Sequence, residues 1–483
     1  MGLIKKLAGQ TAIYGISSIV VRMLSYLLFP YYTHIFGQTQ YGVVTDIYAL
    51  IPFALVVLTM GMESSYFRFA AKTDTAGKRH LFATTWGITS LAAAVFAVVV
   101  IAFRAPIGAA LGWVYVEHPM YVVLMALIVM FDVWATIPFS RLREQGRAVR
   151  FVTLRIINIV IQVALALVFG ATGLFRTEFG VGWVFVANLA ASVLTWVLIL
   201  PTCDRVVPKV DWVLLRRIFA YSMPLLIGGV AGTAGEFLDR QLIKILTPES
   251  AAFAQLGIYG AVTKIAVVML LFTQMYRLAA EPFFLSNFRK EEFTETNAAA
   301  MKYYVMVAMA IFLGIALFKD LFALLAGPEF REGVYILPVI LMGHLLAGVW
   351  LNLSFWYKRE ERTRYAVYVT VVGLVFNVAA NVALIPRMGF YGAAWARLVS
   401  EAAMVAVSWW LNRRYFPTPY DWRRIGEYVV VGLSLYFVVT AVDDATESLW
   451  VQYGVSLVAL GVYALYAAWR ENILTMIRMK LKR

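Results

Sequence analysis

Ionisable side chains inside strongly apolar segments are the residues of this sequence best placed to do chemistry. Eight of them are candidates for a functional site: the basic residues Arg22, Arg240, Lys244 and Lys264, and the acidic residues Asp46, Asp132, Glu236 and Asp239. A charge inside a bilayer is costly, so such residues usually face a cavity or an ionic partner. The basic residues could bind an anionic group such as phosphate. The acidic residues could hold a proton or a cation.

Three of these residues share one helix face in the segment AGEFLDRQLIKIL. Glu236, Arg240 and Lys244 are spaced at i, i+4 and i+8. Glu236 can neutralise Arg240, but Lys244 then repels Arg240 unless an anion lies opposite. One interpretation is a cationic cleft for an anionic ligand, in which Arg22 and Lys264 take part. The other is that Asp46, Glu236 and Asp239 neutralise the basic residues as buried ion pairs.

The other buried charges have simpler explanations. Arg155 lies one turn from the predicted end of its helix and can extend toward water. Arg397 and Glu401 are four residues apart and can pair on one helix face. Asp132 has no charged neighbour in its segment. It could hold a proton or a cation, or donate or accept a hydrogen bond between helices.

Composition requires that these residues are positioned by membrane helices. The chain of 483 residues is 62% hydrophobic and only 14% charged, and its mean hydropathy is +0.76. Many segments exceed the roughly 20 apolar residues that cross a bilayer. We therefore predict an all-α polytopic membrane protein with about 14 transmembrane helices, the first of them a retained helix and not a signal peptide. The expected spans are 9–35, 41–67, 80–103, 119–140, 150–171, 180–201, 218–246, 256–286, 300–318, 333–357, 365–385, 390–411, 425–441 and 448–469.

The distribution of Lys and Arg predicts the direction of these spans. Alternate connections, together with the two termini, hold roughly thirty of the 42 basic residues, whereas the other connections hold about five. Both termini are therefore expected to face the cytoplasm. The net charge of +14 is accounted for by this basic fringe beside an anionic leaflet, and no nucleic acid is needed to explain it.

An internal repeat predicts two lobes. The segment YGVVTDI at 41–47 returns as YGAVTKI at 259–265, which is an offset of 218 that also relates Arg22 to Arg240 and Glu63 to Glu281. Six spans separate the copies, so both have the same orientation and the repeat is parallel. We expect an N-terminal lobe at 1–205, a C-terminal lobe at 206–415, and two further helices with a basic tail at 416–483. A ligand would lie between the lobes near mid-membrane. The change from Asp46 to Lys264 would make the lobes electrically unequal.

Catalytic and metal-binding signatures are missing from the sequence. Its four histidines are not paired at ligand spacing, Cys203 is its single cysteine, and Walker A and GxSxG motifs do not occur. We therefore expect neither an enzyme nor a resident metal or organic cofactor.

Three stretches resemble a known family. They are LLFPYYTHIFGQTQYGVVTDIYALIPFALVVLTMGMESSYFRF, FAYSMPLLIGGVAGTAGEFLDRQLI with its continuation LGIYGAVTKIAVVMLLFTQMYRLAAEPFFLS, and ERTRYAVYVTVVGLVFNVAANVALIPRMGFYGAAWARLVSE. Their order and spacing are similar to bacterial polysaccharide (O-antigen, Wzx-type) flippases of the multidrug/oligosaccharidyl-lipid/polysaccharide exporter superfamily. The resemblance covers most of the chain to about residue 415.

The resemblance implies a function in the bacterial inner membrane. Members of the family move undecaprenyl-pyrophosphate-linked oligosaccharide from the cytoplasmic to the periplasmic leaflet through a positively charged lumen. It implies phosphate-facing roles for Arg22, Arg240 and Lys264, with coupling to Na+ or H+ at carboxylates such as Asp46 or Asp132. Membrane lipids and polysaccharide polymerase or export proteins would be its partners. The alternatives are a cation-coupled multidrug exporter, a lipid II flippase, and a non-transporting scaffold of a polysaccharide synthase complex.

Overall fold

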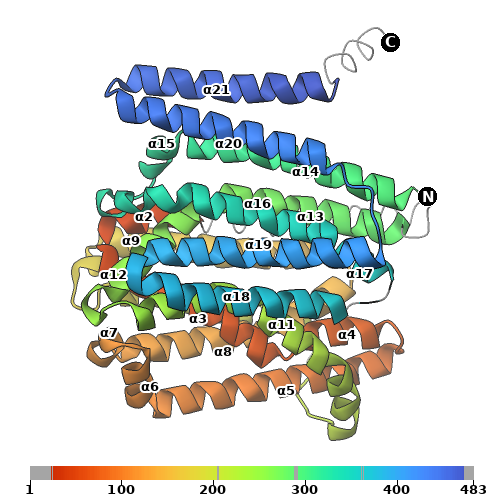
Figure 1. Cartoon of the computed structure of the whole chain (residues 1–483). Coiled ribbons are helices and arrows are strands. Elements are labelled where there is room, and N and C mark those ends of the chain that lie inside the picture. Colours follow the sequence, from red (N-terminus) through yellow and green to blue (C-terminus); the bar gives the residue numbers. More distant parts are fainter. Residues whose placement is uncertain are drawn as a thin grey trace. The chain divides into compact units, whose positions relative to one another are not determined.

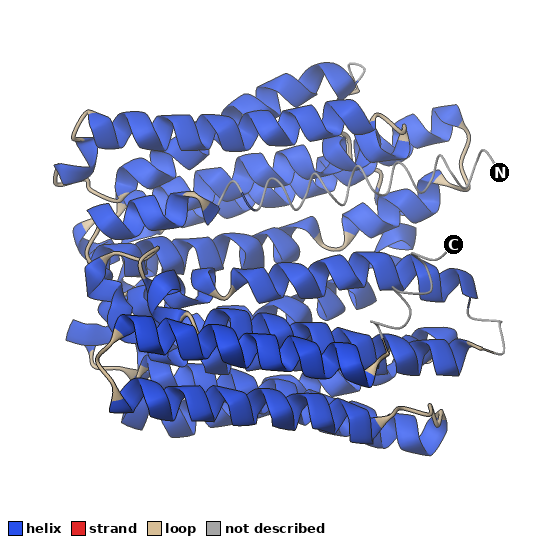
Figure 2. Cartoon of the chain, turned by 90° about the horizontal axis from the view of Figure 1, so that it is seen from above, coloured by secondary structure: helices blue, strands red, loops and turns tan. Residues whose placement is uncertain are grey.

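The protein is helical throughout the part of the chain that the structure describes. The computed structural model describes residues 23, 26–203, 206–287, 292–360, 362 and 364–472. Every regular element within these ranges is an α-helix or a 3-10 helix, as Figures 1 and 2 show. The predicted all-α class is therefore confirmed.

Eleven helices or helix pairs of the described residues are long and apolar enough to cross a membrane. They are Gln38–Ala70, Thr75–Ala102, Met120–Glu144, Ala148–Ala171, Gly182–Cys203, Trp212–Leu246, Phe293–Ala316, Pro328–Arg359, Arg364–Met388, Trp422–Ala445 and Leu449–Arg470. Helices α12 (Glu249–Ile265) and α13 (Val267–Asn287) form one more candidate span, bent by 52° at their junction. Each coincides with a span expected from hydropathy.

Two of the predicted spans are not among these candidates. The first, 9–35, lies largely outside the described residues; only its end is seen, as α2 (Leu28–Ile35). The twelfth is present as α19 (Phe390–Tyr415), which is 26 residues long but less apolar because Arg397 and Glu401 lie within it. The predicted count of fourteen is therefore not confirmed.

Short helices join the long ones. Two of the connections contain α6 (Arg104–Leu111) with α7 (Trp113–Glu117), and α15 (Lys319–Ala323) with η3 (Pro328–Ile336). Two carboxylates begin the longest helices: Asp74 accepts from the N–H of Gly77 at the start of α5, and Asp211 accepts from two N–H groups at the start of α11. Such caps satisfy donors that have no partner within the helix.

The chain forms two compact units, Met1–Gly260 and Ala261–Arg483, which we call the N-terminal and C-terminal units. The first includes α11 (Trp212–Leu246) and most of α12. The division predicted from the repeat, with lobes at 1–205 and 206–415 and two further helices at 416–483, describes how the sequence is duplicated. It stays a prediction.

Helix α8 (Met120–Glu144) is central to the N-terminal unit. It packs against α3 (Gln38–Thr59), α5 (Thr75–Ala102), α9 (Ala148–Ala171) and α10 (Gly182–Ile199), and α11 packs against α3. Where α8 meets α5, buried apolar residues that include Phe82, Trp86 and Ile137 form one core cluster. This arrangement brings the polar faces of several spans together.

The second predicted span is broken near its middle. Helix α3 ends at Thr59 and α4 (Met62–Ala70) begins after Met60 and Gly61, which both have left-handed backbone conformations with φ of 51° and 67°. A left-handed conformation is unfavourable for a methionine, whereas glycine adopts it at little cost. The break changes the direction in which Glu63 projects.

In the C-terminal unit, α16 (Leu337–Leu353) packs against α13, α14 (Phe293–Ala316) and α19, and α19 also packs along α18 (Arg364–Met388). The last two helices, α20 (Trp422–Ala445) and α21 (Leu449–Arg470), pair with one another and lie on α14. Arg397 and Glu401 are 3.0 Å apart in α19, which confirms their predicted pairing.

Candidate functional site

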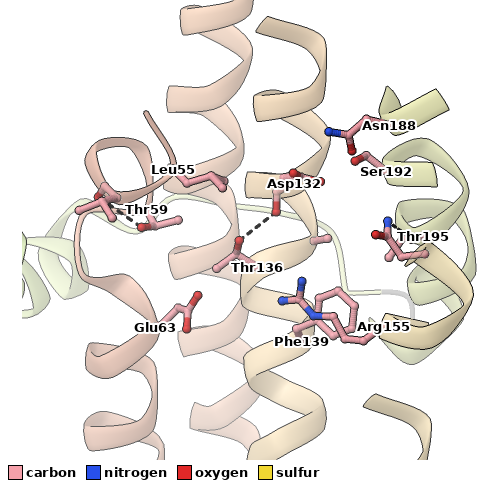
Figure 3. A pocket seen from close by; sticks show the side chains of 13 residues that line it. Leu55, Thr59, Glu63, Asp132, Thr136, Phe139, Arg155, Asn188, Ser192 and Thr195 are labelled. Atoms are coloured by element: carbon pink, nitrogen blue, oxygen red, sulfur yellow. Dashed lines mark hydrogen bonds between the residues drawn. The ribbon is translucent and has the colours of Figure 1, made fainter. Parts of the chain in front are cut away.

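A polar cavity of about 280 Å³ lies inside the N-terminal unit, among membrane helices. Figure 3 shows the side chains that line it. They come from the broken span α3–α4 and from α8, α9 and α10: Leu55, Val56, Thr59, Glu63, Asp132, Ala135, Thr136, Phe139, Arg155, Asn158, Asn188, Ser192 and Thr195.

The lining follows helical periodicity on each element. Helix α10 contributes Asn188, Ser192 and Thr195 at i, i+4 and i+7, which places their polar groups on one face. The broken span contributes Thr59 from the end of α3 and Glu63 from the start of α4, on the two sides of its break. Helix α10 therefore turns a polar stripe toward the cavity, and the break in the second span adds Thr59 and Glu63 to the lining.

Two carboxylates and one guanidinium give the cavity its charge. Glu63 and Asp132 approach it from α4 and α8, and the guanidinium of Arg155 from α9 lies below Asp132 and at about the level of Glu63 in Figure 3. Arg155 also stacks over the Phe139 ring, with its Cζ 4.3 Å from the ring centroid. One cation cannot neutralise two carboxylates, so the fully ionised cavity has an excess negative charge.

Hydrogen bonds hold the uncharged lining in place. The Nδ2 of Asn158 donates to Thr195 Oγ1 at 2.9 Å, and the hydroxyl of Thr136 donates to the Asp132 backbone carbonyl at 2.9 Å. Tyr48 accepts from Gln162 at 3.1 Å beyond the cavity. Carboxylate, hydroxyl and amide oxygens are suited to a proton or a hard cation. The described residues hold no group of three or more His, Cys, Asp or Glu that could bind a metal ion.

Asp46 and Lys244 form a second polar cluster in the same unit. The Lys244 ammonium lies 2.6 Å from Asp46 Oδ2, and their side chains are only 6% and 0% exposed. Tyr115 donates to the same carboxylate at 2.7 Å, and Gln241 donates to its other oxygen at 2.7 Å. Lys244 also donates to the Leu111 carbonyl at 3.1 Å. The positive charge of Lys244 is therefore compensated within the protein.

The repeated segments pack closely beside this cluster. A Cβ atom at Gly42 would overlap the Phe253 carbonyl, and a Cβ atom at Gly260 would overlap the Thr45 side chain. Gly42 and Gly260 are the equivalent glycines of the repeat, since 218 residues separate them. Small residues allow the backbones of two membrane helices to approach in this way.

Arg240 has weaker compensation than Lys244. Its nearest carboxylate oxygen, from Glu236 one turn earlier, is 4.0 Å from Nη1, and Glu236 is itself 58% exposed. Its contact with the Glu236 carbonyl is long, at 3.5 Å. Within the described part of the chain, the buried Nε–H of Arg240 has no hydrogen-bond partner. This donor is available to an acceptor that the described residues do not supply.

Three predicted site residues remain, namely Asp239, Lys264 and Arg22. Asp239 is 2% exposed in α11. Lys264 is half-buried near the end of α12 and belongs to the C-terminal unit. Arg22 falls outside the described residues. Of the eight candidates, the structure brings together Asp46 with Lys244 and Glu236 with Arg240.

The uncharged side of the cavity was not predicted from the sequence, where Arg155 was expected to extend toward water and Glu63 entered only as a member of the repeat. A signal was present: Asn188, Ser192 and Thr195 recur with helical spacing in an otherwise apolar span. Asn158 lies three residues after Arg155, on the same face of its helix. A search for polar stripes, in addition to charges, would have found this lining.

Comparison of the sequence with known proteins gives two matches, and both are to proteins of polysaccharide or glycan biosynthesis. A family profile described as polysaccharide biosynthesis protein matches residues 7–288. A probable low-salt glycan biosynthesis flippase, Agl15 of Haloferax volcanii, is 21% identical over 319 residues, which cover 65% of this chain and 66% of that protein.

Solved structures show the same fold. The lipid II flippase MurJ, in an inward closed conformation, matches with a TM-score of 0.78 and 12% identity over 96% of this chain and 100% of its own. An inward-facing multidrug resistance MATE family transporter of the MOP superfamily matches with a TM-score of 0.66 and 14% identity, over 83% of this chain and 98% of its own. At such identities the likeness concerns the fold.

Proposed function

The chain belongs to the polysaccharide biosynthesis protein family, and from this premise we propose that it is a flippase for polyprenyl-pyrophosphate-linked oligosaccharide. The family resemblance seen in the sequence is confirmed by the profile match. The proposed reaction moves the glycan and its pyrophosphate from the cytoplasmic to the periplasmic leaflet of the inner membrane by alternating access. The flippase name of the archaeal relative supports this assignment.

The observation that carries the proposal is the incomplete pairing of Arg240. A guanidinium with a buried, unsatisfied Nε–H and a carboxylate only at 4.0 Å remains able to bind an anion. Its fork of N–H donors matches the oxygens of a phosphate group. We assign Arg240 to the pyrophosphate, together with Arg22 and Lys264, two further basic residues of the repeated helix pairs.

Lys244 has a different role in this proposal. Because Asp46 accepts its hydrogen bond and compensates its charge, Lys244 fixes α11 against α3 and leaves Arg240 as the less fully compensated cation of the stripe. Asp46 therefore serves to hold α3 and α11 together in this proposal, and we do not assign ion coupling to it. This assignment separates the two basic residues that the sequence placed on one face.

The polar cavity is the proposed site of energy coupling. Glu63 and Asp132 share one guanidinium there, so uptake of one H+ or Na+ would neutralise the excess negative charge. The cavity lies among α3, α4, α8, α9 and α10, and a change of its charge would alter how these helices repel or attract one another. Asp132 is the principal candidate because it lies at the middle of its membrane span.

Translocation in liposomes tests the function and the role of Arg240 together. Purified protein would be reconstituted with a fluorescent polyprenyl-pyrophosphate oligosaccharide, and transfer between leaflets would be measured for the wild type and for Arg240→Ala, Arg240→Lys and Lys264→Ala. The matched control is Arg423→Ala, which removes an arginine that is 87% exposed. Loss of one charged hydrogen bond to phosphate predicts a decrease of about tenfold or more for Arg240→Ala.

The outcomes separate the competing functions. Transport that falls in Arg240→Ala but not in Arg423→Ala supports the proposal. Transport that is equal in all variants would leave the flippase function but remove the assigned phosphate site. A wild type that moves only lipid II, or only cationic dyes, would identify the lipid II flippase or the multidrug exporter instead. No transport of any of these substrates would favour the scaffold.

A further inference from the structure

A second cavity in the N-terminal unit lies at the Lys/Arg-rich end of its helices, the end that the sequence predicts to face the cytoplasm. Its volume is about 410 Å³, and its lining comes from α4, the first turn of α5, the end of α8 and the turn before α9. Four cationic side chains and one carboxylate contribute to the wall, namely Lys78, Arg79, Arg141, Arg147 and Glu144. The wall therefore has an excess of three positive charges.

Two of the four cations are held by the protein itself. Lys78 donates to Glu144 at 2.6 Å. Arg141 is 7% exposed, donates to the Cys203 carbonyl at 3.0 Å and lies over the Phe82 ring at 4.5 Å. These contacts hold Lys78 and Arg141 in place on one side of the cavity. They do not compensate the positive charges on the other side.

Arg79 and Arg147 form that second side. Both are exposed, and neither has a carboxylate within ion-pair distance among the described residues. Two uncompensated guanidinium groups on one cavity repel each other unless an anion is bound there. Guanidinium groups bind phosphate oxygens through paired hydrogen bonds.

The position of the cavity points to a lipid as the source of the anion. Tyr66 and Arg141 on its wall belong to the ends of the membrane spans Gln38–Ala70 and Met120–Glu144. The cavity is therefore at the level of lipid headgroups, where basic pockets between helices bind anionic headgroups. Its volume is more than ten times the roughly 30 Å³ that one water occupies, which is enough for a phosphate and its ester substituents.

We propose that this cavity binds the phosphate of a lipid in the adjoining leaflet, with Arg79 and Arg147 as its principal donors. The phosphate could belong to an anionic phospholipid or to a polyprenyl pyrophosphate. The site is separate from the polar cavity of Figure 3. Binding there does not require that the protein translocates its lipid.

Lipid binding to the purified full-length chain tests the proposal. Native mass spectrometry would measure retention of phosphatidylglycerol, of phosphatidylcholine and of undecaprenyl pyrophosphate in separate arms. The double variant Arg79→Ala/Arg147→Ala would be compared with Arg150→Ala/Arg217→Ala. The control pair removes the same charge from exposed positions of the same unit that do not line the cavity.

We expect the wild type and the control to bind one of the two anionic lipids equally, and the cavity variant to bind it about tenfold or more weakly. A decrease confined to phosphatidylglycerol identifies a phospholipid site, and one confined to undecaprenyl pyrophosphate identifies a site for that lipid. Arg79→Lys/Arg147→Lys should retain part of the binding. Equal binding by the cavity variant and the control, or retention of zwitterionic phosphatidylcholine equal to that of both anionic lipids, would overturn the proposal.

Discussion

Lys244 and Asp46 lie 2.6 Å apart although 198 residues separate them in the sequence. The pair joins α11 to α3, and Tyr115 and Gln241 complete the hydrogen bonds of the carboxylate. Burial of two charges is costly, and the attraction between them offsets that cost only when both partners are present and well hydrogen-bonded. The pair therefore specifies how these two helices meet.

Removal of one partner should be more harmful than removal of both. Asp46→Leu or Lys244→Met leaves one buried charge without compensation, which typically costs about 3–5 kcal/mol. The double variant Asp46→Leu/Lys244→Met should recover most of that loss because no buried charge remains. Thermal unfolding in detergent, arranged as a double-mutant cycle, measures the coupling. Single variants that unfold at the wild-type temperature would contradict this account.

The close approach of α12 to α3 gives a second prediction. Gly42→Ala should lower the unfolding temperature, because the added Cβ overlaps the Phe253 carbonyl, and overpacking of this kind costs about 1–3 kcal/mol. Gly454→Ala in α21 is the matched control, since nothing lies within 4 Å of its added Cβ. At Gly454, alanine should leave the free energy of unfolding unchanged or raise it by up to about 1 kcal/mol. Equal effects of the two substitutions would argue against the close approach.

The sequence predicted most of the membrane helices because hydropathy along a chain is a local property. The spans expected at 119–140 and 448–469 appear as Met120–Glu144 and Leu449–Arg470, with ends that extend a few residues into polar flanks. The pairing of Arg397 with Glu401 was also predictable, because four residues on a helix fix their separation.

Properties that depend on distant parts of the chain could not be predicted in the same way. Asp46 and Lys244 have many possible partners in sequence, and only the packing of α3 on α11 selects this pair. The break at Met60 was missed because its neighbours continue the apolar pattern of the span. The cavity required four polar stripes to converge, and no single helix reveals that convergence.

Protonation outside the membrane predicts a pH dependence of stability. A hydrogen bond from His80 and, next, one from the Leu214 N–H hold the pKa of Asp211 below its usual value. A lowered pKa means that this stabilisation is complete above the unfolded pKa of about 4 and is lost as the pH falls through the folded pKa. Asp211→Asn retains an oxygen that can cap α11 but removes the charge.

The unfolding temperature of Asp211→Asn should therefore fall less steeply than that of the wild type between about pH 5 and pH 3. His80→Phe should flatten the same part of the profile, because it removes the first of the two hydrogen bonds. Unfolding temperatures measured across this range test both variants. Profiles parallel to that of the wild type would show that the His80–Asp211 contact does not contribute.

The polar cavity gives the final prediction, which concerns coupling. Asp132→Asn removes one of two carboxylates that share Arg155 and leaves a side chain of similar size. If a proton or Na+ binds there, the variant should lose most of the acceleration that an imposed H+ or Na+ gradient gives to lipid transfer in liposomes. Its folding should change little, since asparagine preserves hydrogen-bonding capacity in a hydrated cavity.

Glu63→Gln and Asp444→Asn complete the comparison. Glu63 lines the same cavity, so its substitution should also weaken the response to the gradient, whereas Asp444 is exposed in α20 and its substitution should have no effect. A response that persists in Asp132→Asn and Glu63→Gln would place coupling elsewhere. A response lost only in Asp132→Asn would assign ion binding to that carboxylate and leave Glu63 as the ionic partner of Arg155.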